Sequence, residues 1–141
     1  MSKPVTIMLV DDDEEDRMIF RDAAMEVNPA DTVYFAEGGM EMLDGLKHYR
    51  TQNKLPALIV LDLNMPRING IETLKMLKNN PEYQHIPVII LSTSVNEVQE
   101  AECMRLGAVH YLTKAATYGE SIRIASFIGD YARNGDKHKK N

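Results

Sequence analysis

Acidic side chains stand at the ends of two apolar runs in the sequence. The first run ends in Asp11, Asp12 and Asp13, and the second ends in Asp62. If both runs are strands of an open parallel sheet, their carboxylates meet at the edge where such sheets bind ligands. Carboxylates gathered there repel one another unless a divalent cation, for which Mg²⁺ is the best candidate, or a lysine lies among them. The pattern predicts a metal-assisted phosphoryl-transfer site.

Composition limits the classes of function. A chain of 141 residues can form one compact domain with a substantial core, and we expect no fused output domain. A net charge of −5 at pH 7 argues against general binding to nucleic acid or anionic lipid. One cysteine, Cys103, excludes an internal disulfide, and the first residues lack the apolar stretch of a signal peptide or membrane span. We expect a cytoplasmic protein.

Strand-like and helix-like segments alternate along the chain. The predicted strands cover 5–10, 32–36, 57–62, 86–92 and 109–112. The predicted helices cover 14–28, 38–50, 70–79, 96–106 and 119–133. Two strands, 58–61 and 88–91, are apolar throughout, which requires helices on both faces of the sheet. The alternation predicts an α/β fold with a doubly wound, five-stranded parallel sheet. We expect one folded domain over 1–133 and a flexible basic tail over 134–141.

Further polar residues follow the later predicted strands. Ser92 and Thr93 come after the fourth strand, and Lys114 comes after the fifth. In a right-handed doubly wound sheet these ends share one edge with the acidic residues. A hydroxyl can donate to a phosphoryl oxygen, a lysine supplies positive charge, and an aspartate can act as the nucleophile. The set therefore fits phosphoryl transfer, in which positioning and charge neutralisation dominate.

The ordered motifs resemble the receiver domains of bacterial response regulators, the phosphoacceptor half of two-component signalling. The motifs lie at 9–13, 61–70, 90–94 and 107–114, and the resemblance covers nearly the whole chain. It implies a flavodoxin-like (βα)5 fold with strand order 2-1-3-4-5. It also implies that Asp62 accepts a phosphoryl group from a kinase phosphohistidine.

The resemblance extends to the remaining site residues. It implies that Mg²⁺ binds Asp12, Asp62 and the backbone carbonyl of Asn64, with Asp11 assisting through water. It assigns Ser92 as the hydroxyl that bonds a phosphoryl oxygen.

Lys114 would be the ion-pair partner of the modified aspartate, and Tyr111 would be the switching aromatic. Asn64 and Ser94 would tune the hydrolysis of the aspartyl phosphate. Phosphorylation would then change the face made by the fourth helix, fifth strand and fifth helix, as a population shift between two packings.

The resemblance also suggests partners. We expect a stand-alone, phosphorylation-controlled binding module, not a metabolic enzyme, that signals through a downstream protein target. The long spacers at 47–54 and 79–86 favour a sensor histidine kinase of phytochrome or hybrid type. A homodimer through the face that changes on phosphorylation is a further expectation.

One motif departs from the family. Receivers usually follow the lysine with a proline whose preceding peptide bond is cis, whereas this chain has Ala115 and Ala116 after Lys114. A cis bond before a non-proline residue costs about 2.5–4 kcal/mol. We expect this loop to be either trans and rearranged or strained.

Other interpretations of the acidic residues stay open. The sequence from Asp11 to Asp13 formally fits the nucleophile motif of a Mg²⁺-dependent phosphatase of the haloacid-dehalogenase type. Within the predicted domain, 1–133, only Glu120 and Asp130 come after Lys114 as acidic metal ligands for such an enzyme. A pseudo-receiver, which binds partners without phosphorylation, is a third possibility. The run Asp13–Asp16 predicts the N-terminus of a helix, where acidic side chains interact well with the macrodipole, and we assign it no chemistry.

Overall fold

Strands and helices alternate strictly along the chain. The computed structural model describes residues 3–65, 69–93 and 95–135. The strands are β1 (Thr6–Val10), β2 (Thr32–Ala36), β3 (Leu58–Asp62), β4 (Val88–Ser92) and β5 (His110–Thr113). The helices are α1 (Glu14–Val27), α2 (Gly39–Thr51), α3 (Gly70–Lys78), α4 (Glu97–Arg105) and α5 (Tyr118–Asn134). Every predicted element is present with its boundaries within two residues of the prediction, while the end of the predicted tail, 136–141, lies outside the described residues.

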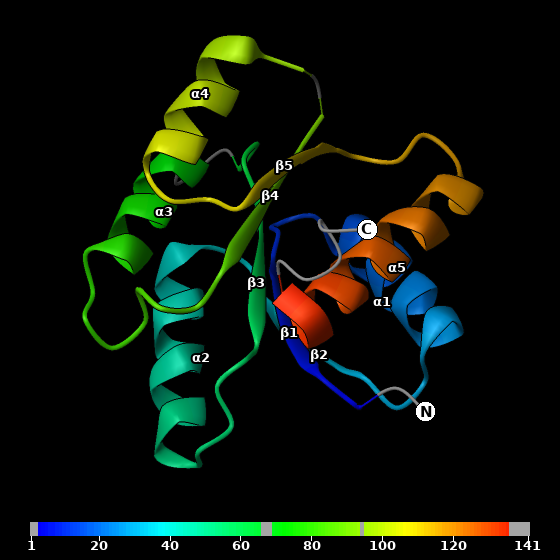
Figure 1. Ribbon diagram of the computed structural model, residues 1–141, viewed down its shortest axis with the longest axis horizontal. Helices are drawn as coiled ribbons and strands as arrows, with labels where there is room; N and C mark the ends of the chain where they lie inside the picture. The colour runs from blue at the N-terminus through cyan, green and yellow to red at the C-terminus, as the bar shows by residue number, and fades with distance from the viewer. Residues whose placement is uncertain (1–2, 66–68, 94, 136–141) are drawn as a thin grey trace.

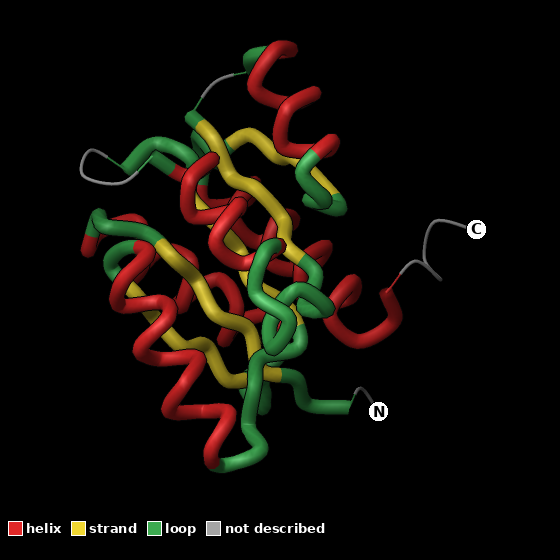
Figure 2. The backbone as a smooth tube through the Cα atoms, turned by 90° about the vertical axis from the view of Figure 1, so that its left-hand side faces the viewer, coloured by secondary structure: helices red, strands yellow, loops and turns green. Residues whose placement is uncertain are grey.

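The strands form one parallel sheet in the order β2-β1-β3-β4-β5. Figure 2 shows the strands in yellow among the red helices. Met8 of β1 lies opposite Tyr34 of β2 on one side and Ile59 of β3 on the other. The predicted flavodoxin-like fold with strand order 2-1-3-4-5 is therefore confirmed. Because the strand order reverses at β1, the edge beyond the carboxyl ends of β1 and β3 is the position at which such sheets bind ligands.

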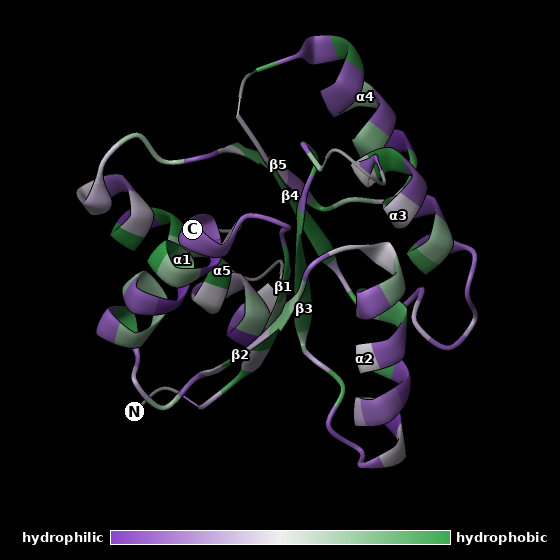
Figure 3. Cartoon of the chain, turned by 180° about the vertical axis from the view of Figure 1, so that it is seen from behind, coloured by the Kyte–Doolittle hydropathy of each residue, from purple (hydrophilic) through white to green (hydrophobic). Residues whose placement is uncertain are grey.

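Helices cover both faces of the sheet. Helices α1 and α5 lie on one face, and α2, α3 and α4 lie on the other (Figure 1). The central strand β3 is buried throughout: Leu58 and Val60 join the core under α1 and α5, while Ile59 and Leu61 join the core on the opposite face. Apolar residues accordingly concentrate along the strands and the inner helix surfaces (Figure 3). This burial on both faces explains why β3 is a continuous apolar run instead of an alternating one.

Side-chain caps fix where four of the helices begin. In each, the side chain before the first helical residue accepts a hydrogen bond from a backbone N–H three residues later. The capping residues are Asp13, Asn69, Asn96 and Thr117. Such caps satisfy backbone donors that a helix leaves unpaired, so they hold the short connections at the carboxyl edge of the sheet. No helix in the described ranges is long and apolar enough to cross a membrane.

The start of α3 packs against the loop that follows Asp62 so closely that only glycine fits. A Cβ atom added at Gly70 would lie 2.7 Å from the Cα atom of Leu63, a backbone atom that no rotamer change can move away. We expect Gly70→Ala to lower the free energy of unfolding by about 1–3 kcal/mol in urea denaturation.

Gly119 supplies the matched control for this change. It also lies in the first turn of a helix, but its added Cβ would meet nothing closer than Thr117 Oγ1 at 3.9 Å. Gly119→Ala should leave stability unchanged or slightly higher, because alanine restricts the unfolded chain. A Gly70→Ala protein as stable as wild type would contradict the close-approach explanation.

Candidate functional site

The carboxyl ends of β1 and β3 bring three aspartates together. Asp11 and Asp12 follow β1 directly, and Asp62 is the last residue of β3. One carboxylate oxygen from each residue lies within 4.8 Å of the others. Asp11 is 2% exposed and Asp62 is 1% exposed, whereas Asp12 is exposed. The fold thus forms the acidic cluster at the edge where the sequence predicts it.

Each buried carboxylate is oriented by the backbone two residues further on. The Asp13 N–H donates to Asp11 Oδ1 over 2.9 Å, and the Asn64 N–H donates to Asp62 Oδ1 over 3.0 Å. The Arg17 guanidinium also donates to the Asp11 carbonyl over 2.8 Å. Both Oδ1 atoms are therefore held by the main chain, so both Oδ2 atoms face the same small region between the strand ends.

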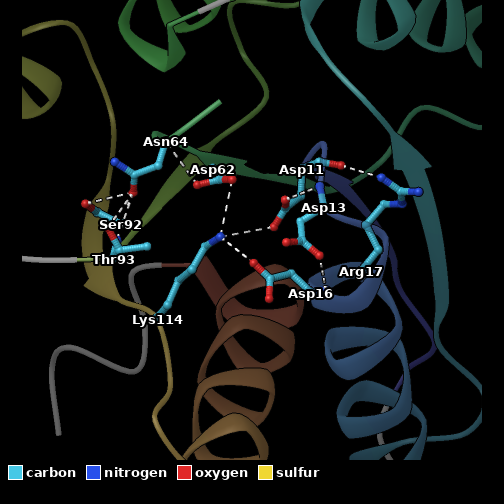
Figure 4. Close-up of polar contacts among 9 residues, drawn as sticks. All are labelled: Asp11, Asp13, Asp16, Arg17, Asp62, Asn64, Ser92, Thr93 and Lys114. Atoms are coloured by element: carbon cyan, nitrogen blue, oxygen red, sulfur yellow. Dashed lines mark hydrogen bonds and ion pairs between the residues drawn. The ribbon is translucent and has the colours of Figure 1, made fainter. Parts of the chain in front are cut away.

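Lys114 fills that region with its ammonium group (Figure 4). Its Nζ atom lies 3.3 Å from Asp11 Oδ2, 3.2 Å from Asp62 Oδ2 and 2.8 Å from Asp16 Oδ2. Burial lowers the pKa of Lys114, but the hydrogen bond to Asp16 and the charges of Asp11 and Asp62 outweigh burial, so the pKa is raised overall. The ammonium is therefore charged at neutral pH.

One lysine does not balance the charge of the cluster. Burial raises the pKa of Asp11 from 3.8 to about 6, and the nearby charge of Asp62 acts in the same direction. The Asp13 N–H and Lys114 lower this pKa without cancelling the rise. Three converging carboxylate oxygens with a shortage of positive charge fit a hard divalent cation such as Mg²⁺, which prefers oxygen ligands.

The polar side chains after β3 and β4 also meet. Asn64 Oδ1 accepts hydrogen bonds from the Thr93 backbone N–H at 2.9 Å and the Thr93 hydroxyl at 3.2 Å. Ser92 Oγ lies 3.4 Å from the same oxygen, and the Ser92 side chain is fully buried at the end of β4. The predicted hydroxyl residues therefore lie beside the loop after Asp62, with the Asn64 amide joining the two strand ends.

Two predicted site residues are not found in this cluster. Tyr111 lies apart from it, and Ser94 is not among the described residues. Tyr111 is half-buried and packs against the core on the α2, α3 and α4 face, so its switching role stays a prediction. Ser94 lies outside the described residues, as do 66–68 in the predicted acceptor loop. The described residues contain no cis peptide bond, so Lys114 and Ala115 are joined by a trans bond, one of the two outcomes expected for the missing proline.

Asp16 is a site residue as well as part of a helix N-terminus, which the sequence did not predict. Asp16 does lie in the first turn of α1, where Asp13 caps its N–H, but its carboxylate also pairs with Lys114. Helical side chains tilt toward the N-terminus, so the third residue of α1 leans back over the strand ends. That geometry is the signal that could have revealed Asp16 as a site residue. The Arg17 contact with the Asp11 carbonyl has no comparable signal in the sequence.

A doubly wound sheet with an acidic cluster, a hydroxyl and a lysine at its carboxyl edge defines a receiver-type α/β domain. The family model of the response regulator receiver domain matches residues 7–124. The chain belongs to the response regulator receiver family, which confirms the resemblance inferred from the sequence. Domains of this family generally bind Mg²⁺ at an acidic cluster and interact with histidine kinases. Membership leaves the haloacid-dehalogenase alternative without support.

Individual relatives match almost from end to end. The polar-differentiation response regulator DivK of Brucella anthropi is 31% identical over 128 residues, covering 90% of this chain and 98% of that protein. The phosphorylated cyanobacterial phytochrome response regulator RcpA has a TM-score of 0.82 at 30% identity, covering 94% of this chain and 96% of that chain. The Mn²⁺-bound form of response regulator Rcp1 has a TM-score of 0.77 at 27% identity, with the same coverage.

The cluster holds three carboxylates and one ammonium, so Mg²⁺ should stabilise the protein. We expect Mg²⁺ to raise the melting temperature, because the cation relieves repulsion that the folded state alone experiences. The gain in the free energy of unfolding should reach about 2.7 kcal/mol at a Mg²⁺ concentration about 100 times its dissociation constant. Asp12→Ala should raise the melting temperature of the metal-free protein and remove most of the Mg²⁺ effect.

Differential scanning fluorimetry with and without Mg²⁺ measures both effects. Asp44→Ala is the control, since Asp44 is an exposed acid on α2, on the other side of the molecule from α1. It should keep the full response to Mg²⁺. A wild-type melting temperature that Mg²⁺ does not move would count against the metal site and favour a pseudo-receiver.

Proposed function

We propose that this protein accepts a phosphoryl group onto Asp62 from the phosphohistidine of a sensor histidine kinase, in a Mg²⁺-dependent reaction. One observation carries the proposal. The Asp62 carboxylate lies 3.2 Å from the Lys114 ammonium, and its oxygen clusters within 4.8 Å of those of Asp11 and Asp12. A carboxylate can act as a nucleophile, and the groups around this one suit the neutralisation of a moving phosphoryl group.

The transfer exchanges one bond to phosphorus for another. An oxygen of Asp62 bonds to phosphorus while the bond between phosphorus and the imidazole nitrogen breaks, and the imidazole leaves. The hydrogen bond from the Asn64 N–H fixes the plane of the Asp62 carboxylate. The Lys114 ammonium and the Ser92 hydroxyl then donate to phosphoryl oxygens. Mg²⁺ held by Asp11, Asp12, Asp62 and the Asn64 carbonyl would supply further neutralising charge to those oxygens.

The signal would leave through the face made by α4, β5 and α5. Ser92 ends β4, and Tyr111 lies on the neighbouring strand β5, paired with Ile90 of β4. A Ser92 hydroxyl drawn toward modified Asp62 would vacate space into which the Tyr111 ring turns, which shifts the population between two packings. Asn64 and Ser94 would set how long the aspartyl phosphate lasts.

The protein would act as a signalling phosphoacceptor and not as a metabolic enzyme. Its own phosphorylation and dephosphorylation would be its chemistry. Similarity to RcpA, a phytochrome response regulator, favours a kinase of the phytochrome type, with a hybrid kinase as the other candidate. A downstream protein that recognises the phosphorylated α4-β5-α5 face would complete the pathway, in the cytoplasm.

Acetyl phosphate tests the phosphoacceptor directly. We expect incubation with Mg²⁺ and acetyl phosphate to add one phosphoryl group to the intact protein in a mass spectrum. Asp62→Asn should abolish the adduct, because the amide is not a nucleophile at this site, while Asp44→Asn should retain it. An adduct that survives Asp62→Asn would move the acceptor elsewhere. The absence of any adduct, with acetyl phosphate or a phosphorylated kinase, would favour a pseudo-receiver.

We also propose that phosphorylation promotes a homodimer through the α4-β5-α5 face. The apolar side chain of Val98, 80% exposed on α4, supports this assignment. Sedimentation equilibrium should show association only with acetyl phosphate and Mg²⁺ present. Val98→Asp should stay monomeric although fully phosphorylated, because dimerisation would bury its charge.

Met40 supplies the control for the dimer. Its side chain is also apolar and 60% exposed, but it lies on α2 outside the proposed interface. Met40→Asp should therefore associate like wild type. A phosphorylated wild-type protein that remains monomeric at every concentration would contradict the dimer while leaving the phosphoacceptor function intact.

A further inference from the structure

Lys114 is bound most closely by a carboxylate that is not part of the acidic cluster. Asp16 Oδ2 lies 2.8 Å from Lys114 Nζ, whereas Asp62 and Asp11 lie at 3.2 and 3.3 Å. Asp16 belongs to α1 and not to a strand end, and it stands 98 residues from the lysine in the chain. Its carboxylate holds the ammonium from the helix side, while the cluster holds it from the sheet side.

The surroundings of Lys114 leave it room to move. A cavity of about 380 Å³ lies between α1, α5 and the loop after β5, and both Lys114 and Asp16 line it. Ala115 and Ala116 contribute only small side chains to its wall, and much of the rest is apolar, including Ile19 and Phe20. A lysine on a flexible four-carbon stem can swing into such a space unless a partner retains its ammonium.

We propose that Asp16 is a positioning residue for phosphoryl transfer, which fixes the Lys114 ammonium beside Asp62. The inference rests on the proposed function and adds a residue to its machinery. An ammonium has three N–H donors, and here it donates to Asp16 and Asp11 while Asp62 is an ion-pair partner 3.2 Å away. The two donors on Asp16 and Asp11 can stay in place while the third remains available for an oxygen of the phosphoryl group that arrives at Asp62. Asp16 thereby anchors the Lys114 ammonium from α1.

A purely structural role for Asp16 makes different predictions. If Asp16 only stabilised the helix N-terminus, Glu15 in the same turn would be equivalent, since both face the same macrodipole. Glu15 is exposed and does not contact Lys114 in the described part of the chain, so Glu15→Ala is a matched control. Asp16→Glu keeps the charge and restores part of the contact.

The test measures the rate of phosphorylation by acetyl phosphate with Mg²⁺ in the full-length protein. Asp16→Ala should lower the maximum rate about tenfold, because the ammonium is no longer held in place, with little change in the half-saturating acetyl phosphate concentration. Glu15→Ala should match wild type, and Asp16→Glu should recover part of the rate. In a Lys114→Ala background, Asp16→Ala should cause no further loss, because its effect passes through the lysine.

Several outcomes would overturn this role. They are an Asp16→Ala rate equal to or above wild type, an equal loss with Glu15→Ala, or an undiminished loss in the Lys114→Ala background. Asp16→Asn, which preserves the shape of the side chain, replaces Asp16→Ala if the latter fails to fold by circular dichroism. A wild-type protein that takes no phosphoryl group would instead overturn the proposed function and this role with it.

Discussion

Repulsion between two buried carboxylates is the constraint on which this sheet edge depends. Asp11 and Asp62 end neighbouring strands, and their Oδ2 atoms share the ammonium of Lys114. Two unit charges 4 Å apart repel by about 4 kcal/mol at an effective dielectric constant of about 20. That energy approaches the whole stability of a small domain, about 5–15 kcal/mol, so the carboxylates need compensation. The fold supplies part of it through Lys114 and two backbone N–H groups, and the remaining charge is what a divalent cation would meet.

The topology of the sheet decides which residues lie together at this charged edge. Parallel strands place all their carboxyl ends on one edge, and the order β2-β1-β3-β4-β5 makes β1 and β3 direct neighbours there. Lys114 follows β5, two strands away from β3, so a long side chain is needed to reach Asp62. Its backbone is held by a 2.7 Å hydrogen bond from the Lys114 N–H to the Ser92 carbonyl. Reach and anchoring together explain why a lysine suits this position.

The elements were predictable from the sequence because local patterns control them. The run Leu58–Leu61 fits a strand buried on both faces. The Asn69 and Thr117 caps lie directly before helices whose starts were predicted to within one residue. The Asp16–Lys114 pair was not predictable from spacing, because it depends on how α1 sits against the end of β5. The trans bond after Lys114, by contrast, agrees with local chemistry, because a cis bond before a non-proline residue costs about 2.5–4 kcal/mol.

Ser92 lies between the loop that follows Asp62 and the loop that carries Lys114. Its hydroxyl lies beside the Asn64 amide, whose own backbone N–H binds Asp62, and its carbonyl accepts the Lys114 N–H. Ser92 is therefore hydrogen-bonded to both the loop after Asp62 and the loop after β5. Strand β4 carries these bonds to its neighbour, because Ser92 lies opposite Thr113 of β5. Tyr111 lies two residues before Thr113 on that strand and is paired with Ile90 of β4, so the site and β5 are joined through the main-chain bonds of the sheet.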